Sequence, residues 1–210
     1  MEHFERTGSL PDILEMIKIQ QRAIQLSPDD HPKMPGWLDN LGVSLLCCFE
    51  HTGNLSNIFE AIKIQQRAIQ LTPDRHPEMP RRLNNVGMSF LCCFQHTDNV
   101  YDLTEAISIQ QQAVKLTPDG HPDILARLSK LAVSFQHRFE YTSDVSDLME
   151  AISIQQQTVQ LSSNGHFDLP MRLDNLGNLF LSRFQHTGNV CDLSEAISTR
   201  RWSPEKSETP

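Results

Sequence analysis

The sequence has few basic residues, no long apolar run and no secretory leader. There are 18 Lys and Arg against 26 Asp and Glu, which gives the 210 residues a formal charge of −8. A protein that binds phosphate groups needs a basic face, and no basic run occurs, so we expect neither nucleic acid nor a membrane as a partner. No apolar stretch approaches the roughly 18 residues of a spanning helix, and the N-terminus has no apolar signal segment. We therefore expect a soluble protein of the cytoplasm.

Cysteine is scarce, and the common catalytic motifs are missing. Five cysteines, an odd number, include the adjacent pairs Cys47–Cys48 and Cys92–Cys93. This pattern does not build a disulfide framework, and we interpret these side chains as free thiols that pack as small apolar groups. No phosphate-binding loop, H-E-x-x-H zinc motif, G-x-S-x-G elbow or glycine-rich dinucleotide fingerprint is present. The sequence thus predicts no enzyme activity, no cofactor and no metal site.

What the sequence does contain is an internal repeat. A phenylalanine returns every 45 residues and opens a near-copy of the same segment each time, at Phe4, Phe49, Phe94, Phe139 and Phe184. A fixed period of this size is typical of a solenoid, in which each unit buries its apolar face only against its neighbours. We expect one repeat domain over residues 1–198, with an irregular or disordered tail over 199–210. Its units are 4–48, 49–93, 94–138 and 139–183, followed by a partial unit, 184–198.

The second half of each unit has the pattern of an amphipathic helix. From Asp102 to Leu116, apolar residues largely follow the three-four spacing of one helical face. Asp102 and Glu105 form a D-x-x-E capping box, which predicts that the helix begins there. The box recurs in every copy, with its first residue at Asp12, Asn57, Asp147 and Asp192.

The first half of each unit predicts a second, longer helix of about 18 to 20 residues against about 15 for its partner. In the second copy, Asp74 is the nearest candidate for its N-cap. This longer helix is expected to end at Gly53 and Gly188, with Asp98 and Ser143 at the equivalent positions of the other copies. One histidine per copy stands beside the helix start, and we interpret this series as a structural part of the repeat junction: His31, His76, His121 and His166.

The apolar spacing resembles that of the tetratricopeptide repeat. The pattern L-x2-[LV]-G-x2-[FL], seen from Leu83 to Phe90, is similar to the first helix of that family, and Ala106, Ala113 and Pro118 match the spacing of its second helix. Where the family usually has an aromatic residue, this chain has a glutamine, so the packing there must differ: Gln65, Gln110 and Gln155. The resemblance implies an all-α fold, an α-α superhelix of antiparallel helix pairs with about nine helices and no β-sheet.

The period exceeds the usual repeat of about 34 residues. The phrases T-P-D-x-H-P and D-L-x-E-A-I resemble fungal arrays that often precede a caspase-like CHAT peptidase domain, and kinesin light chain repeats more distantly. The resemblance implies a scaffold without activity that binds a protein or peptide. The alternative is a sensor or regulatory fragment of a larger enzyme, such as a CHAT-type peptidase. Because neither end carries a polar capping helix, we also expect self-association through uncapped array ends.

The resemblance also implies where a partner binds. In tetratricopeptide arrays the first helices line a concave groove that receives an extended peptide or a partner helix. It places these candidate residues on that face: Asp39, Asn40, Asn84, Asn85, Met88, Lys130, Asp174, Asn175 and Asn178. Asparagine donates and accepts at once, which suits a peptide backbone. An equally weighted interpretation is that these asparagines bond within the array and stabilise it.

Overall fold

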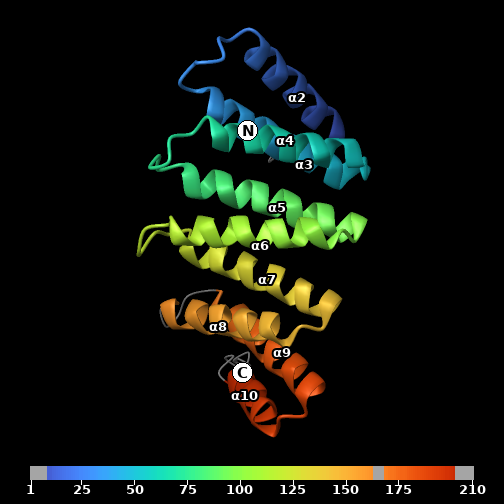
Figure 1. Cartoon of the computed structure of the whole chain (residues 1–210), viewed down its shortest axis with the longest axis vertical. Coiled ribbons are helices and arrows are strands. Elements are labelled where there is room, and N and C mark those ends of the chain that lie inside the picture. The colour runs from blue at the N-terminus through green and yellow to red at the C-terminus, as the bar shows by residue number, and fades with distance from the viewer. Residues whose placement is uncertain (1–8, 163–167, 202–210) are drawn as a thin grey trace, which may run out of the picture. The chain divides into compact units, whose positions relative to one another are not determined.

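The computed structural model describes residues 9–162 and 168–201, and over these residues it contains nine helices and no strand (Figure 1). The chain divides into two compact units, Met1–Leu116 and Thr117–Pro210. The first unit holds α2 (Leu10–Gln25), α3 (Met34–Thr52), α4 (Leu55–Gln70), α5 (Met79–Thr97) and α6 (Val100–Lys115). The second holds α7 (Ile124–Thr142), α8 (Val145–Leu161), α9 (Leu169–Thr187) and α10 (Val190–Arg201). The predicted all-α fold is confirmed.

Two kinds of helix alternate along the chain, as predicted. The A helices, α3, α5, α7 and α9, have 19 residues each. The B helices are α2, α4, α6, α8 and α10, of which the first three have 16 residues. The last one, α10, runs to Arg201, so residues 199–201 are helical and not irregular. The rest of the predicted tail, Phe4 and His166 lie outside the described residues.

Short turns make successive helices antiparallel. Only Gly53 and Asn54 separate α3 from α4, which leaves no room for the chain to travel back before the next helix starts. In the first unit α3 packs on α4 and α5 on α6, while α2 lies against α3 and α4 against α5. In the second unit α7 packs on α8, α8 on α9 and α9 on α10. Each unit is thus a stack of helix hairpins, as its part of Figure 1 shows.

The A helices end where the turn chemistry predicts. Each C-cap residue has a left-handed backbone, with φ of 66° at Gly53, 54° at Asp98, 59° at Ser143 and 72° at Gly188. Its N–H donates to the carbonyl of the repeated phenylalanine four residues earlier, which satisfies one of the last carbonyls of the helix. The side chain of that phenylalanine is almost fully buried in the first unit, at Phe49 and Phe94.

The N-caps of α4, α6 and α8 lie three residues before the first residue of the predicted capping box. In α4 the N-cap is Asn54, whose Oδ1 accepts a hydrogen bond from the backbone N–H of Ser56 at 3.1 Å. Asn99 and Asp144 cap α6 and α8 in the same way. The box prediction was therefore wrong, because its first residue lies inside the first turn of each helix, at Asp12, Asn57, Asp102, Asp147 and Asp192.

In the first unit, this first-turn position ties a B helix to the A helix before it. Asn57 donates from Nδ2 to Sγ of Cys48, nine residues earlier, at 3.3 Å. Asp102 contacts Cys93 in the next copy, where burial of the thiol and then its hydrogen bond to the carboxylate raise the pKa of Cys93 to about 12. Cys48 and Cys93 are buried free thiols, but each also has a polar partner that the prediction of plain apolar packing did not include.

In the second unit, arginine and aspartate make the same tie. Arg138 donates from Nε and Nη2 to the two carboxylate oxygens of Asp147, at 2.8 and 2.5 Å. Arg183 and Asp192 repeat this fork, at 3.0 and 2.5 Å. A two-bonded pair between a guanidinium and a carboxylate fixes the angle between the helices as well as their separation. The array therefore uses two chemistries at one structural position.

The A helices begin later than Asp74 predicts. The N-cap of α5 is Glu78, and His76 forms a turn before it: its N–H donates to Pro73 O, and its Nδ1 accepts from the Glu78 N–H at 3.1 Å. Because His76 precedes Pro77, its own backbone is disfavoured from helix, which delays the start. The same ring-to-backbone bond confirms the structural interpretation at His31 and His121.

A glutamine takes the place of the aromatic residue that the resemblance leads one to expect. Gln65 is 1% exposed, and a Cβ added to Gly42 would lie 2.3 Å from Gln65 Cγ. Gln110 lies over Gly87 in the same way, with its Cγ 2.8 Å from such a Cβ. Gly42 and Gly87 therefore allow a close approach, so that the amide side chain of a glutamine fits between two helices.

Candidate partner-binding surface

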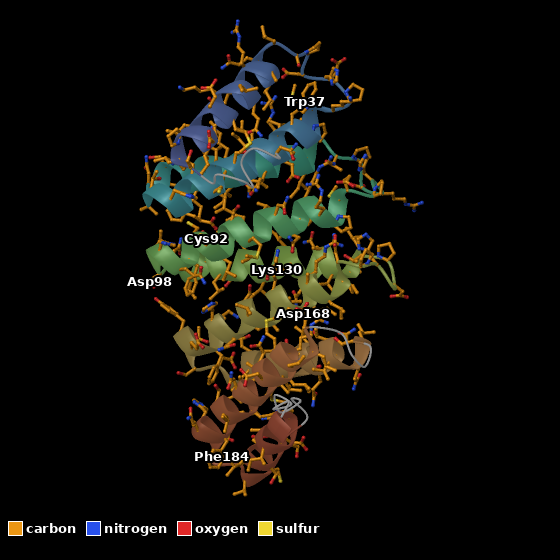
Figure 2. The ribbon with its side chains drawn as sticks, turned by 180° about the vertical axis from the view of Figure 1, so that it is seen from behind. Trp37, Cys92, Asp98, Lys130, Asp168 and Phe184 are labelled. Atoms are coloured by element: carbon orange, nitrogen blue, oxygen red, sulfur yellow. The ribbon has the colours of Figure 1, made fainter. Side chains whose placement is uncertain are left out.

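The structure places every predicted site residue on an A helix. Asp39 and Asn40 lie on α3, and Asn84, Asn85 and Met88 on α5; in the second unit Lys130 lies on α7, and Asp174, Asn175 and Asn178 on α9. The side chains of the last three are exposed, those of Asn40, Asn84, Asn85, Met88 and Lys130 are half-buried, and that of Asp39 is buried. Figure 2 labels Lys130 on its helix.

Asp39 is an internal group that links α3 to α5. It is 0% exposed, and its carboxylate accepts from Arg81 Nη1 at 2.7 Å and from Asn85 Nδ2 at 3.1 and 3.2 Å. A buried carboxylate is tolerated when it is paired and hydrogen-bonded, as it is here. Asp39 thus orients Arg81 and Asn85, and it is shielded from direct contact with a partner.

Arg81 is a residue of this surface that the sequence analysis did not predict. Its Nε donates to Glu78 at 2.6 Å, and this hydrogen bond lowers the pKa of the Glu78 carboxyl. The Arg81 side chain is still 41% exposed. The equivalent positions in the other copies are Gly36, Ala126 and Met171, so no period marks it.

Four side chains form a strip along α5 at helical spacing: Arg81, Asn84, Asn85 and Met88. Residues three and four apart share one face of a helix, so these groups lie in a row. Arg81 and Asn85 both donate hydrogen bonds to the buried Asp39 carboxylate, and Gln110 Nε2 lies 3.9 Å from the sulfur of Met88. We call this row the α5 strip. It presents a guanidinium, amide groups and a thioether to whatever contacts α5.

The second unit presents a different set of groups. Burial and then the nearby Arg127 guanidinium lower the pKa of Lys130. On α9, Asn178 Nδ2 lies 3.4 Å from Asp174 Oδ2, a long contact that orients the pair weakly. The structure brings Asp174, Asn175 and Asn178 together on one exposed helix face.

Neither a metal site nor a membrane-spanning helix occurs in the part of the chain that the structure describes. No group of three or more His, Cys, Asp or Glu side chains in these ranges could hold a metal ion. No described helix is both long enough and apolar enough to span a bilayer.

The arrangement of helices is similar to that of several solved structures. No protein-family model matches the sequence, and no curated protein matches it. A kinesin light chain-type protein of Podosopora anserina, with nearly identical TPR-like repeats, has a TM-score of 0.68 at 13% identity, over 97% of this chain and 93% of that one.

Two further structures support the same likeness. MamA has a TM-score of 0.60 at 14% identity, over 95% of this chain and 93% of its own. BtubC (BKLC) from P. vanneervenii has a TM-score of 0.58 at 15% identity, over 99% of this chain and 79% of its own. At such low identity the likeness concerns the fold, which is that of a tetratricopeptide-like helical repeat protein.

Proposed function

We propose that this protein is a non-catalytic scaffold of the cytoplasm that binds an extended segment of a partner protein along its A helices. The tetratricopeptide-like fold supports a protein-interaction role in general. The observation that supports the position is the α5 strip, in which a buried carboxylate, Asp39, holds Arg81 and Asn85 ready. A side chain fixed before binding loses less conformational entropy when a partner arrives.

The chemistry of the α5 strip suits an extended acidic peptide. Amide side chains such as Asn84 can donate to and accept from a peptide backbone without reading its sequence. Arg81 supplies a planar guanidinium whose fork fits a carboxylate of the partner. On α9 the exposed Asp174, Asn175 and Asn178 offer amide contacts beside a negative charge. We infer that the α5 strip of the first unit selects acidic side chains, and that the α9 face of the second unit by itself offers backbone contacts.

A peptide-display selection tests this function. Random peptides of about a dozen residues are selected on the wild-type chain, and the recovered peptides are measured against Arg81→Ala/Asn84→Ala and Asn85→Ala/Asn175→Ala. We expect acidic peptides and a loss of at least about tenfold in affinity for the first variant, since arginine is a common hot-spot residue. Gln112→Ala, on the exposed side of α6, is the matched control. Peptides that bind all variants equally would exclude the groove model.

A second candidate is a regulatory role within a larger CHAT-type peptidase, and the motif phrases shared with such arrays favour it. The reading frame downstream of Pro210 distinguishes the two candidates. A following domain with a Cys-His dyad supports the regulatory role, and its absence supports the scaffold. Self-association through the ends of the array belongs to either proposal, and sedimentation at several protein concentrations measures it.

A further inference from the structure

In three of the four A helices, α5, α7 and α9, an arginine near the start of the helix is buried. Arg82, Arg127 and Arg172 are 5%, 6% and 6% exposed. Each donates from Nη1 to a hydroxyl just beyond the preceding B helix, on Thr72, Thr117 and Ser162, at 2.7, 2.6 and 2.5 Å. The three arginines therefore share one setting, and their remaining partners can be compared directly.

Arg82 differs from the other two in its charge partner. Arg127 and Arg172 each pair with an aspartate four residues earlier, Asp123 at 3.0 Å and Asp168 at 3.4 Å. Glu78 occupies that position before Arg82 but is turned to Arg81.

No residue of the described ranges makes an ion pair with Arg82. Burial lowers its pKa, and the carboxylates of Asp39 and Glu78 oppose this shift only at a distance. Its Nε is buried without a hydrogen bond, as is that of Arg172. A buried guanidinium without a counter-charge is costly, so an incoming anion is favoured there.

Arg82 lines a cavity of about 360 Å³ between the loop before α3 and the loop before α5. Cavities of about 300 Å³ and more are the usual size of small-molecule sites. His31 and His76 also line it. Their Nδ1 atoms accept backbone hydrogen bonds, so each neutral ring carries its proton on Nε2 and is a donor there.

The first of these rings is held in place by stacking. The His31 ring stacks on Trp37, with the ring centres 4.6 Å apart. Figure 2 shows Trp37 at the start of α3, beside this loop. The cavity therefore combines a buried cation with ring N–H donors of fixed orientation.

The cavity also carries acidic groups, and these decide the class of ligand. Asp29 is paired with Arg67 Nη2 at 3.0 Å, whereas Asp30 is exposed and has no partner among the described residues. A dianion such as phosphate would be repelled by the carboxylates of Asp29 and Asp30. A molecule with one carboxylate and one ammonium group would match Arg82 and Asp30 together. Prolines, a methionine and a leucine form the apolar part of the lining.

We propose that the cavity between these two loops binds a small zwitterion of the amino-acid class, with its carboxylate at Arg82, its ammonium group at Asp30 and an apolar side chain against the prolines. This site lies apart from the α5 strip and does not depend on the function proposed there. Binding would give the buried guanidinium the counter-charge that its counterparts already have.

An NMR titration of the full chain tests the proposal, with L-leucine as the probe up to about 20 mM. The amide signals to follow are those of Lys33 and Glu78, because both N–H groups donate to the cavity histidines. We expect saturable shifts at both amides. Isocaproate, which lacks the ammonium group, and isoamylamine, which lacks the carboxylate, should each bind at least about tenfold more weakly.

Two variants complete the test. Asp30→Asn and Arg82→Lys should each weaken leucine binding at least about tenfold, whereas Asp74→Asn, an exposed aspartate outside the cavity, should leave it unchanged. Asp30→Asn changes an exposed loop residue, so the test does not depend on whether Arg82→Lys folds. The proposal is overturned if leucine shifts neither amide, if isocaproate or phosphate binds as well as leucine, or if Asp30→Asn binds like the wild type.

Discussion

Replacing Arg138 with the cysteine of the first two copies is expected to destabilise the second unit. In Arg138→Cys, the Asp147 carboxylate, whose side chain is 5% exposed, loses both of its arginine hydrogen bonds. Breaking a buried pair by removing one partner costs about 3–5 kcal/mol, and the N-terminal dipole of α8 returns only about 0.3–1 kcal/mol to the unpaired charge. We expect a net loss of about 3 kcal/mol in the stability of α7 and α8.

A second substitution, taken from another copy of the repeat, is expected to restore the stability lost in Arg138→Cys. Adding Asp147→Asn recreates the pair of the α3–α4 hairpin, Cys48 with Asn57. Exchanging a buried ion pair for a neutral pair is often close to neutral, so we expect the double variant within about 1 kcal/mol of the wild type. The contact of Arg138 with the Phe135 ring, at 5.4 Å, is lost in both variants and cancels from their difference. The interaction free energy of the cycle should be at least about 2 kcal/mol.

Hydrogen exchange of the α7 and α8 amides is the suitable assay, because a repeat array need not unfold in one step. Asp147→Asn alone closes the cycle, and we expect it to cost less than Arg138→Cys, since the arginine side chain is 26% exposed and can reach water. The reasoning is refuted if Arg138→Cys costs less than about 1 kcal/mol, or if the double variant is no more stable than that single one.

Three smaller predictions concern turns, packing and thiols. Ser143→Gly should stabilise the protein by roughly 0.5–1 kcal/mol, and Gly53→Ala should destabilise it by about 1 kcal/mol, because both positions have positive φ. Urea unfolding midpoints that move in the opposite directions would contradict this. Gly87→Ala should cost about 1–3 kcal/mol in urea unfolding, as its Cβ would lie 2.8 Å from a glutamine carbon; an unchanged midpoint contradicts close packing. In the native protein at about pH 8, iodoacetamide should modify the exposed Cys191 and leave Cys93 unmodified, which peptide mass spectrometry can measure. Rapid labelling of Cys93 would contradict its burial and its raised pKa.

The helix ends that are set by local chemistry could be predicted from the sequence. A residue such as Gly53 after a long apolar stripe leaves few alternatives to a left-handed cap, so all four A-helix ends agree. The B-helix starts failed for a physical reason. Asn99 and Asp102 can each cap a helix, but in the structure Asn99 is the cap, while Asp102 contacts Cys93 in the preceding helix. Local propensity does not contain that information.

The polar surface could be predicted only in part. The helix face of Asn84 and Asn85 follows from spacing, but the engagement of Asn85 by Asp39 joins residues 46 apart in the chain. Arg81 could not be predicted from the repeat, because an arginine occurs at this position in one copy only. Arg82 recurs with the period, yet nothing in the sequence shows that Glu78 turns away from it and leaves a buried charge without a pair.

The ties between Arg138 and Asp147 and between Cys48 and Asn57 bear on how such a chain can grow. Both partners of each tie lie nine residues apart within one helix hairpin. A duplication or deletion of one whole hairpin, an A helix with the B helix that follows it, would therefore carry a complete tie with it, whichever chemistry that hairpin uses. Hairpins with different ties can stand side by side without any matching change in their neighbours. The number of hairpins in the array is thus free to vary, because each hairpin keeps the contact that joins its own two helices.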